Sequence, residues 1–239
     1  MKFIHIADIH ANRERKMETL KIIDTLIKTV EEEDIEAVLF CGDFWDSTIT
    51  NTEASGFSEI VKAMKKLIDE TEVIMIYGTP SHEPDGSLDV FKDFGATVVP
   101  YKYNCTAIVP EDEHLIFCLP EPRLTKIPGN SLEEKVKNYH ESIAMTLEKA
   151  NDYKNSDGRK VIVMYHGDIA GAKLQNDTEV PDEGFALSKK ELESFGADYI
   201  ACGHIHKPQK VMDNCYYSGS ACPKDFGETH DAIFKIVEL

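Results

Sequence analysis

Five short apolar runs constrain the fold of this 239-residue chain, because aspartate, histidine or both soon follow each of them. The runs cover 3–7, 37–41, 73–77, 161–165 and 199–202. Runs of this length are typical of buried strands, and polar residues at the ends of neighbouring strands gather at one edge of a sheet. The residues that follow the runs are Asp8, His10, Asp43, Asp46, His82, Glu83, His166, His204 and His206. Carboxylates and imidazoles gathered in this way predict a metal site at the sheet edge.

The pair His204 and His206 is the most specific of these motifs. Side chains at positions i and i+2 of an extended segment point the same way, so both rings can face one ligand. Each motif alone has a simpler interpretation, such as a helix N-cap for Asp8 or ordinary turn chemistry for Asp43. The recurrence at five strand ends favours the metal site.

The segments between the runs supply the scaffold. Apolar residues at helical spacing predict helices over 14–33 and 52–69, and Ser131 with Glu134 forms a capping box that opens a helix to about 151. Further strands are expected near 97–99, 105–109, 114–119, 209–213, 215–219 and 230–237, short helices over 86–94 and after Ser188, and loops over 120–129 and 167–187. Early βαβ units followed by β-rich sequence predict one α/β domain over 1–239, a four-layer αββα sandwich of two mixed sheets.

The composition narrows the class of partner. The chain has 43 acidic and 26 basic residues and a formal charge of −17, which opposes broad attraction to nucleic acid. Two divalent cations would add roughly +4 locally, so the field at the site can differ from that of the whole surface. No run approaches the ~18 apolar residues of a membrane helix. The six cysteines read as reduced core thiols, and we expect a cytoplasmic protein with no membrane partner.

The order of the motifs resembles the calcineurin-like metallophosphoesterase superfamily over residues 8–206. The segments 203–209, 217–220 and 226–228 are similar to those of the DNA repair nucleases of the SbcD type. This resemblance implies a hydrolase with two divalent cations, Mn in preference to Fe or Zn, in which a bridging hydroxide attacks phosphorus in line.

The resemblance also implies a ligand set. Asp8, His10 and His206 would hold one cation, Asp43 would bridge, and His166 and His204 would complete the second site with an oxygen at the position of Ser81. The family has asparagine there, and a serine hydroxyl is a poorer donor to a cation than an amide oxygen. The second cation would then bind more weakly, take a water, or use the Thr79 side chain or nearby backbone.

The remaining site residues follow from the same resemblance. His82 would contact the scissile phosphate and protonate the leaving oxygen, and Glu83 would orient His82. Asp46 is expected to support the ligands, with a helix N-cap as the alternative. Trp45 would stack on a base or else pack behind the metal loop, and Lys207, Lys210 and Lys224 are candidate contacts to a polynucleotide.

Three functions stay open. The first is an exonuclease-like phosphodiesterase acting on DNA. The second is a phosphatase or phosphodiesterase for a small nucleotide or phosphoprotein, which a closed pocket built by 167–187 would favour. The third is a non-catalytic binding module, which the six intact ligands disfavour. SbcD-type nucleases carry a DNA-contacting cap domain and a segment that docks a coiled-coil ATPase, and we expect this chain to lack both.

Overall fold

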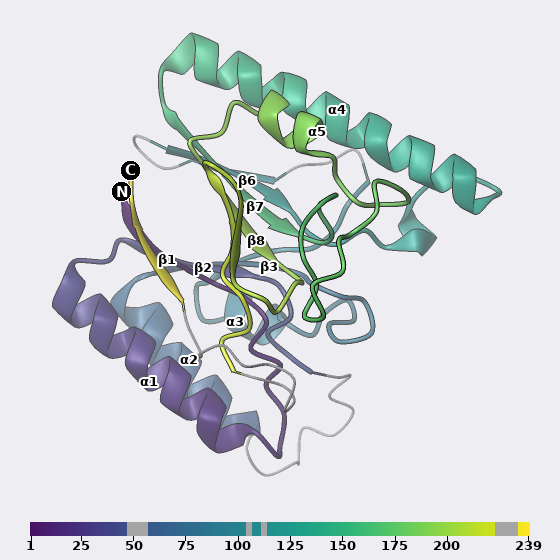
Figure 1. The fold of residues 1–239 in the computed structure, drawn as a ribbon. Helices are drawn as coiled ribbons and strands as arrows, with labels where there is room; N and C mark the ends of the chain where they lie inside the picture. The colour runs from purple at the N-terminus through teal and green to yellow at the C-terminus, as the bar shows by residue number, and fades with distance from the viewer. Residues whose placement is uncertain (47–56, 104–106, 111–113, 223–233) are drawn as a thin grey trace.

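Two stacked β-sheets with helices on their outer faces form the fold (Figure 1). The computed structural model describes residues 1–46, 57–103, 107–110, 114–222 and 234–239. The first sheet has the order β11 (Lys235–Glu238), β1 (Lys2–Ile6), β2 (Ala37–Cys41), β3 (Glu72–Ile76), β4 (Thr97–Val99). The second has the order β5 (Ala107–Pro110), β6 (His114–Leu119), β7 (Lys160–His166), β8 (Tyr199–Gly203), β10 (Cys215–Tyr217), β9 (Gln209–Met212). The αββα prediction is confirmed.

Helices cover both sheets on the side away from the interface between them. The first sheet carries α1 (Lys16–Glu33), α2 (Phe57–Glu70) and the short α3 (Asp89–Lys92), and the second carries α4 (Leu132–Asp157) and α5 (Lys189–Ser194) (Figure 1). A single 3₁₀ turn, η1, spans Leu124–Lys126. Among the described residues, no helix combines the length and the apolar character needed to cross a bilayer.

Strand β2 shows why the apolar runs are continuous rather than alternating. Ala37, Leu39 and Cys41 pack in the cluster between the two sheets, whereas Val38 and Phe40 pack in the cluster beneath α1 and α2. Both faces of the strand are therefore buried from solvent, as is usual for parallel strands covered on both sides. Strands β1 to β4 are parallel, and so are β6, β7, β8 and β10, so their carboxyl ends share one edge.

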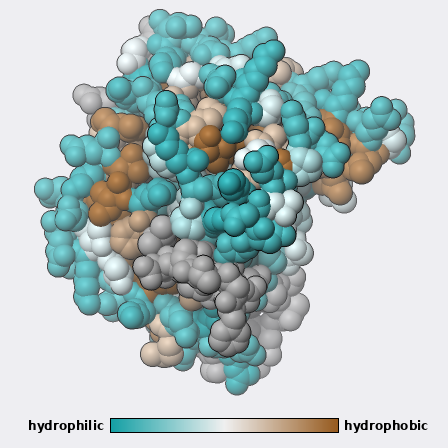
Figure 2. Space-filling model, in the orientation of Figure 1, coloured by the Kyte–Doolittle hydropathy of each residue, from teal (hydrophilic) through white to brown (hydrophobic). Residues whose placement is uncertain are grey.

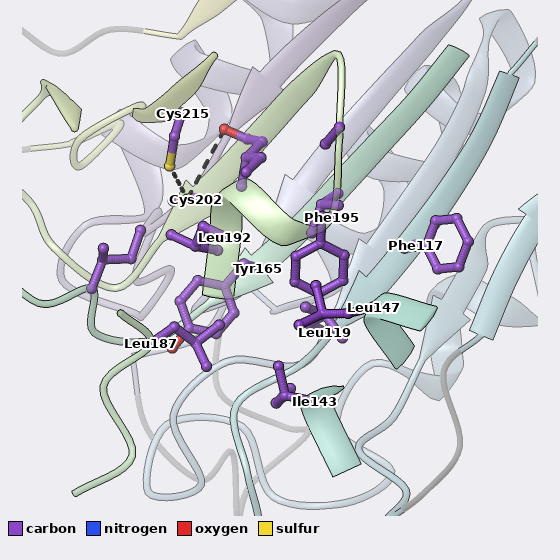
Figure 3. Close-up of a cluster of buried hydrophobic side chains, with 14 of the residues drawn as sticks. Phe117, Leu119, Ile143, Leu147, Tyr165, Leu187, Leu192, Phe195, Cys202 and Cys215 are labelled. Carbon is purple, nitrogen blue, oxygen red and sulfur yellow. Dashed lines mark hydrogen bonds between the residues drawn. The ribbon is translucent and has the colours of Figure 1, made fainter. Parts of the chain in front are cut away.

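The core under α4 and α5 fixes the second sheet. Figure 3 shows Phe117 and Leu119 of β6 beside Ile143 and Leu147 of α4, with Phe195 following α5. In the same cluster the sulfurs of Cys202 and Cys215 lie 3.6 Å apart as thiols. The described cysteines are all buried and none forms a disulfide, in agreement with the expected core thiols.

The element boundaries differ from expectation mainly at α4. The helix continues past residue 151 to Asp157 and ends at Gly158, which has a φ of 69° and donates its N–H to the carbonyl of Lys154. The last turns are polar, so apolar spacing did not reveal them, whereas a glycine at the C-cap is the usual stop signal. Parts of the helix expected at 52–69 and of the strands expected at 105–109 and 230–237 lie outside the described residues.

Candidate metal centre

The carboxyl ends of four strands bring the expected ligands together. Two groups form, one of Asp8, His10 and His206 and one of Asp43, His166 and His204; within each, candidate ligand atoms lie within 4.8 Å of one another. These are the two sets that the resemblance assigns to the two cations. A third group of His10, Asp46 and His82 adjoins the first.

Backbone strain is concentrated at these strand ends. Asp8, His10, Asp43 and His204 have φ angles of 53°, 50°, 52° and 99°, in the left-handed region that residues with side chains rarely adopt. Hydrogen bonds from the Asp8 N–H to the Gly42 carbonyl and from the His10 N–H to the Asp43 carbonyl, at 3.1 and 3.0 Å, hold the turns. Strain held in place by surrounding bonds is typical of functional sites.

Two glycines let the ligand loops approach closely. Gly42 has a φ of 86°, and a Cβ there would lie 2.2 Å from Nδ1 of His166. A Cβ on Gly78 would lie 2.2 Å from Oδ1 of Asp43. Any larger residue at either position would therefore displace a candidate ligand.

The first group has the geometry of a shared ligand site. The Nε2 atoms of His10 and His206 are 2.9 Å apart, and Asp8 is fully buried beside them. Burial raises the pKa of Asp8 to about 6, although His166 and His206 oppose that shift. Oδ1 of Asp46 lies 3.5 Å from Nδ1 of His10, the ring nitrogen that faces away from His206. A carboxylate on the outer nitrogen of a ligand histidine fixes the ring, and Asp46 is placed to do this for His10.

Asp43 lies between the two groups. Its Oδ2 is 3.0 Å from Nδ1 of His82, 3.5 Å from Nε2 of His166 and 3.9 Å from Nε2 of His10. Burial opposes ionisation, but His166, His82 and His10 hold the pKa of Asp43 well below its usual range. One carboxylate oxygen thus faces histidines of both groups, as a bridging ligand requires.

His166 shows how strongly this centre attracts positive charge. Its Nδ1 donates to the carbonyl of Cys41 at 2.7 Å, which leaves Nε2 toward Asp43. Burial lowers the pKa of this imidazole, but Asp43 and Asp8 outweigh burial and raise it to about 10. Carboxylates that retain a proton on a fully buried ring will attract a divalent cation more strongly still. The donor set of imidazoles and carboxylates therefore fits two such cations.

Glu83 makes different contacts from those expected. Its buried carboxylate accepts four backbone N–H bonds, from Asp43 at 3.2 Å, Phe44 at 2.6 Å, Trp45 at 3.2 Å and Gly78 at 2.7 Å. Burial, and then the charge of Asp43, raise the pKa of Glu83 to about 7. Glu83 therefore fixes the loop that carries Asp43 instead of orienting His82.

Thr79, and not Ser81, contacts the second group from the loop after β3. Ser81 is exposed and, among the described residues, makes no hydrogen bond to the second group. Thr79 donates its N–H to Oδ1 of Asp43 at 2.6 Å, and its Oγ1 lies 3.0 Å from Oδ2 of the same residue. The loop after Gly78 makes a tight turn, in which the N–H of His82 bonds to the Thr79 carbonyl at 2.9 Å, so Ser81 lies at the outer tip.

Glu121 is a site residue that the sequence reasoning missed. Its Oε2 lies 3.6 Å from Nε2 of His166, 3.6 Å from Nδ1 of His204 and 2.9 Å from Oγ1 of Thr79. The signal was available, because Glu121 follows β6 as the other ligands follow their strands. Flanking prolines made the segment read as a plain loop.

The candidate substrate contacts are buried, paired with carboxylates or outside the described residues. Trp45 is 1% exposed, stacks on Phe57 and Phe91, and donates its indole N–H to the Ser87 carbonyl at 3.1 Å, so it packs behind the metal loop and is not available to stack on a base. Lys207 and Lys210 form ion pairs with Asp177 and Asp213 at 2.5 and 2.8 Å. Lys224 lies outside the described residues.

A cavity of about 350 Å³ adjoins the second group. Glu121 and His204 line it together with Asp168, Val180 and Phe185 of the loop between β7 and α5. The loop 167–187 therefore lines one side of a partly open cavity, and Pro80 and residues within 121–124 line it as well. Its charged lining residues are the carboxylates of Glu121, Asp168 and Glu183.

Comparison with known proteins agrees with this geometry. The family model for calcineurin-like phosphoesterase matches residues 1–208. The chain is 25% identical to the SbcD component of the nuclease SbcCD from Staphylococcus epidermidis and 26% identical to that from Bacillus subtilis, over 97% and 95% of its own length. It spans 64% and 63% of those two relatives, just under two thirds. A crystal structure of a dimetal phosphatase from Danio rerio has a TM-score of 0.57 at 11% identity, covering 90% of this chain and 85% of that one, and shows a shared fold.

Proposed function

Because this chain belongs to the calcineurin-like phosphoesterase family, a family of metal-dependent phosphoester hydrolases, we propose that it cleaves phosphodiester bonds in DNA with two divalent cations, manganese being the favoured metal. The observation that carries the proposal is the position of Asp43. A single buried carboxylate oxygen faces His10 of one group and His166 of the other. Cations on either side of it would lie about 3.5–4 Å apart, the spacing used for in-line phosphoryl transfer.

Each residue has a distinct task in this proposal. Asp8, His10 and His206 would hold one cation, His166 and His204 would hold the other, and Asp43 would contribute to both sites. When bound, the two cations lower the pKa of a water molecule and neutralise charge on the phosphoryl oxygens. The protein keeps these ligands in place through Glu83, Asp46 and the left-handed turns at the strand ends.

His82 is the proposed proton donor. Its side chain is 26% exposed, and its Nδ1 lies 3.0 Å from Oδ2 of Asp43. If Nδ1 carries a proton and donates it to that carboxylate, the hydrogen bond fixes the orientation of the ring. Nε2 is then the nitrogen that would give a proton to the leaving oxygen. The ring also packs edge-on against His10, with centroids 4.8 Å apart, so it lies at the edge of the cation site.

DNA as substrate is supported by the two nuclease relatives, which cover nearly all of this chain. Both are named as one component of a nuclease complex, so association with a second protein, the ATPase implied by the resemblance, is part of the same proposal. The net charge of −17 would confine DNA contact to the cation site.

The cavity of about 350 Å³ favours a second candidate, a phosphodiesterase for small nucleotides. Its size suits one base with its sugar, and the carboxylates of Glu121, Asp168 and Glu183 can accept hydrogen bonds from hydroxyl or amino groups. A pocket without a lysine or arginine among its described lining residues is unfavourable for further phosphates, so the ligand it fits is a nucleoside portion.

The test compares Mn-loaded protein on bis-p-nitrophenyl phosphate, p-nitrophenyl phosphate, linear DNA and a dinucleotide. His82→Ala should lower turnover of the DNA by at least about 100-fold, because general acid catalysis contributes that much. His140→Ala, which removes an imidazole bonded to Glu191 and Gly184, is the matched control. Hydrolysis of the dinucleotide without DNA would favour the second candidate. Hydrolysis of the monoester alone would contradict both.

A further inference from the structure

We propose that Glu121 is a ligand of the second cation, taking the place that the family gives to an asparagine on the loop after β3. This inference rests on the proposed function only in assuming that the centre binds two cations. The residue at the asparagine position of the loop, Ser81, is exposed, and the carboxylate arrives instead from the segment after β6.

The distances are slightly longer than those between ligands of one ion. Oε2 of Glu121 is equally far, 3.6 Å, from Nε2 of His166 and Nδ1 of His204. Ligand atoms bound at ~2.1 Å to one cation are roughly 3.0–3.5 Å apart at right or tetrahedral angles. In the first group, the Nε2 atoms of His10 and His206 are 2.9 Å apart, which is close to the same range.

The other ring nitrogens face a backbone carbonyl and a carboxylate, which favours these two atoms as ligands. Nδ1 of His166 donates to the Cys41 carbonyl, and Nε2 of His204 lies 3.7 Å from Oδ1 of Asp168. A ligand histidine commonly has a carbonyl or carboxylate on its outer nitrogen. The two nitrogens that remain are the ones that face Glu121.

The hydroxyl of Thr79 supplies an independent argument. Its Oγ1 lies within hydrogen-bond distance of two carboxylates, Oδ2 of Asp43 at 3.0 Å and Oε2 of Glu121 at 2.9 Å. A hydroxyl has one proton and can donate to only one of them. The other carboxylate is left without that proton, and a cation held between Asp43, Glu121 and Nε2 of His166, in place of the proton on that ring, would stabilise both carboxylates.

Metal binding without substrate tests the proposal. Apo protein would be titrated with Mn²⁺ and followed by calorimetry and by the electron paramagnetic resonance signal of a coupled manganese pair. Wild type should bind two ions, and Glu121→Gln should bind the second at least about tenfold more weakly and lose the coupled signal at two equivalents. Glu183→Gln removes one charge from the same cavity and should match wild type, as should Ser81→Ala.

Two ions bound by Glu121→Gln with wild-type affinities and a coupled signal would overturn the proposal. If Glu121→Gln fails to fold by circular dichroism, Glu121→Asp decides: its shorter side chain keeps the charge and should weaken only the second ion, and unchanged affinity would again overturn the assignment. This experiment contains no substrate, so it tests metal binding alone. The nuclease proposal would fail in a different way, with both ions bound and the DNA left intact.

Discussion

At the residue scale, the two carboxylates that follow β2 have different surroundings despite being three positions apart. Asp43 is buried among the histidines of both groups, whereas Asp46 lies beside the outer nitrogen of His10 and accepts a hydrogen bond from the Asn12 amide at 3.1 Å. Sequence alone could separate them only through the resemblance. The structure gives the physical reason, since only Asp43 reaches both groups.

Asp43→Asn should therefore lower kcat on a phosphodiester more than Asp46→Asn. Removing a ligand shared by two ions should cost at least about 1,000-fold, and removing support for one ligand about 10–100-fold. Steady-state kinetics with saturating Mn²⁺ measures both variants. A larger loss in Asp46→Asn would contradict the bridging assignment.

Glu83→Gln should destabilise the protein by about 2–3 kcal/mol, because one oxygen that accepts backbone N–H bonds becomes an amide donor facing other donors. Urea unfolding of the metal-free protein checks this. Glu148→Gln, at an exposed position on α4, is the control and should stay within about 0.5 kcal/mol of wild type. A Glu83→Gln variant as stable as that control would show that the four bonds contribute little.

At the element scale, the strands were predictable because each is a short apolar run bounded by turn residues. Ser131 and Ser188 marked two helix starts. The structure confirms side-chain caps at both serines. The turns of α4 beyond residue 151 were not predictable, because their polar side chains carry no apolar spacing. The contact between Thr79 and Glu121 was not predictable, because it depends on how two loops from different sheets meet.

Helices α4 and α5 are joined by an ion pair that should make stability depend on pH. Nδ1 of His140 lies 2.7 Å from Oε1 of Glu191, which raises the pKa of the imidazole. Burial opposes the charge on Glu191, but hydrogen bonds from His140 and Ser188 lower its pKa to about 2. The histidine therefore stabilises fully below its unfolded pKa of about 6.5, and the glutamate above its own of about 4.3.

The loss of unfolding free energy in His140→Ala should accordingly be largest between about pH 4.5 and 6.5 and should shrink as the pH rises through the raised pKa of His140. Urea denaturation at pH 5.5 and pH 8.5 measures it. Lys137→Ala, which removes an exposed pair with Glu141 on the same helix, should show no such change over this range. A His140→Ala effect equal at both pH values would contradict the linkage.

At the scale of the whole molecule, the fold gathers candidate cation ligands at one edge, whereas the net negative charge of the surface opposes the approach of a phosphodiester. The parallel strands of both sheets end at one edge and concentrate imidazoles and carboxylates there, while hydrophilic residues cover most of the face shown in Figure 2, with separate hydrophobic patches. With a formal charge of −17, the surface at large repels a polyanion. Attraction of a phosphodiester must then come from cations at the site, so the function depends on their binding.

The most direct test of that dependence is anomalous diffraction from Mn-soaked crystals, recorded on both sides of the manganese edge. We expect two peaks about 3.5–4 Å apart, one among Asp8, His10 and His206 and one beside His166 and His204, with Asp43 between them. A single peak, or none, in protein that is otherwise correctly folded would contradict a two-cation centre.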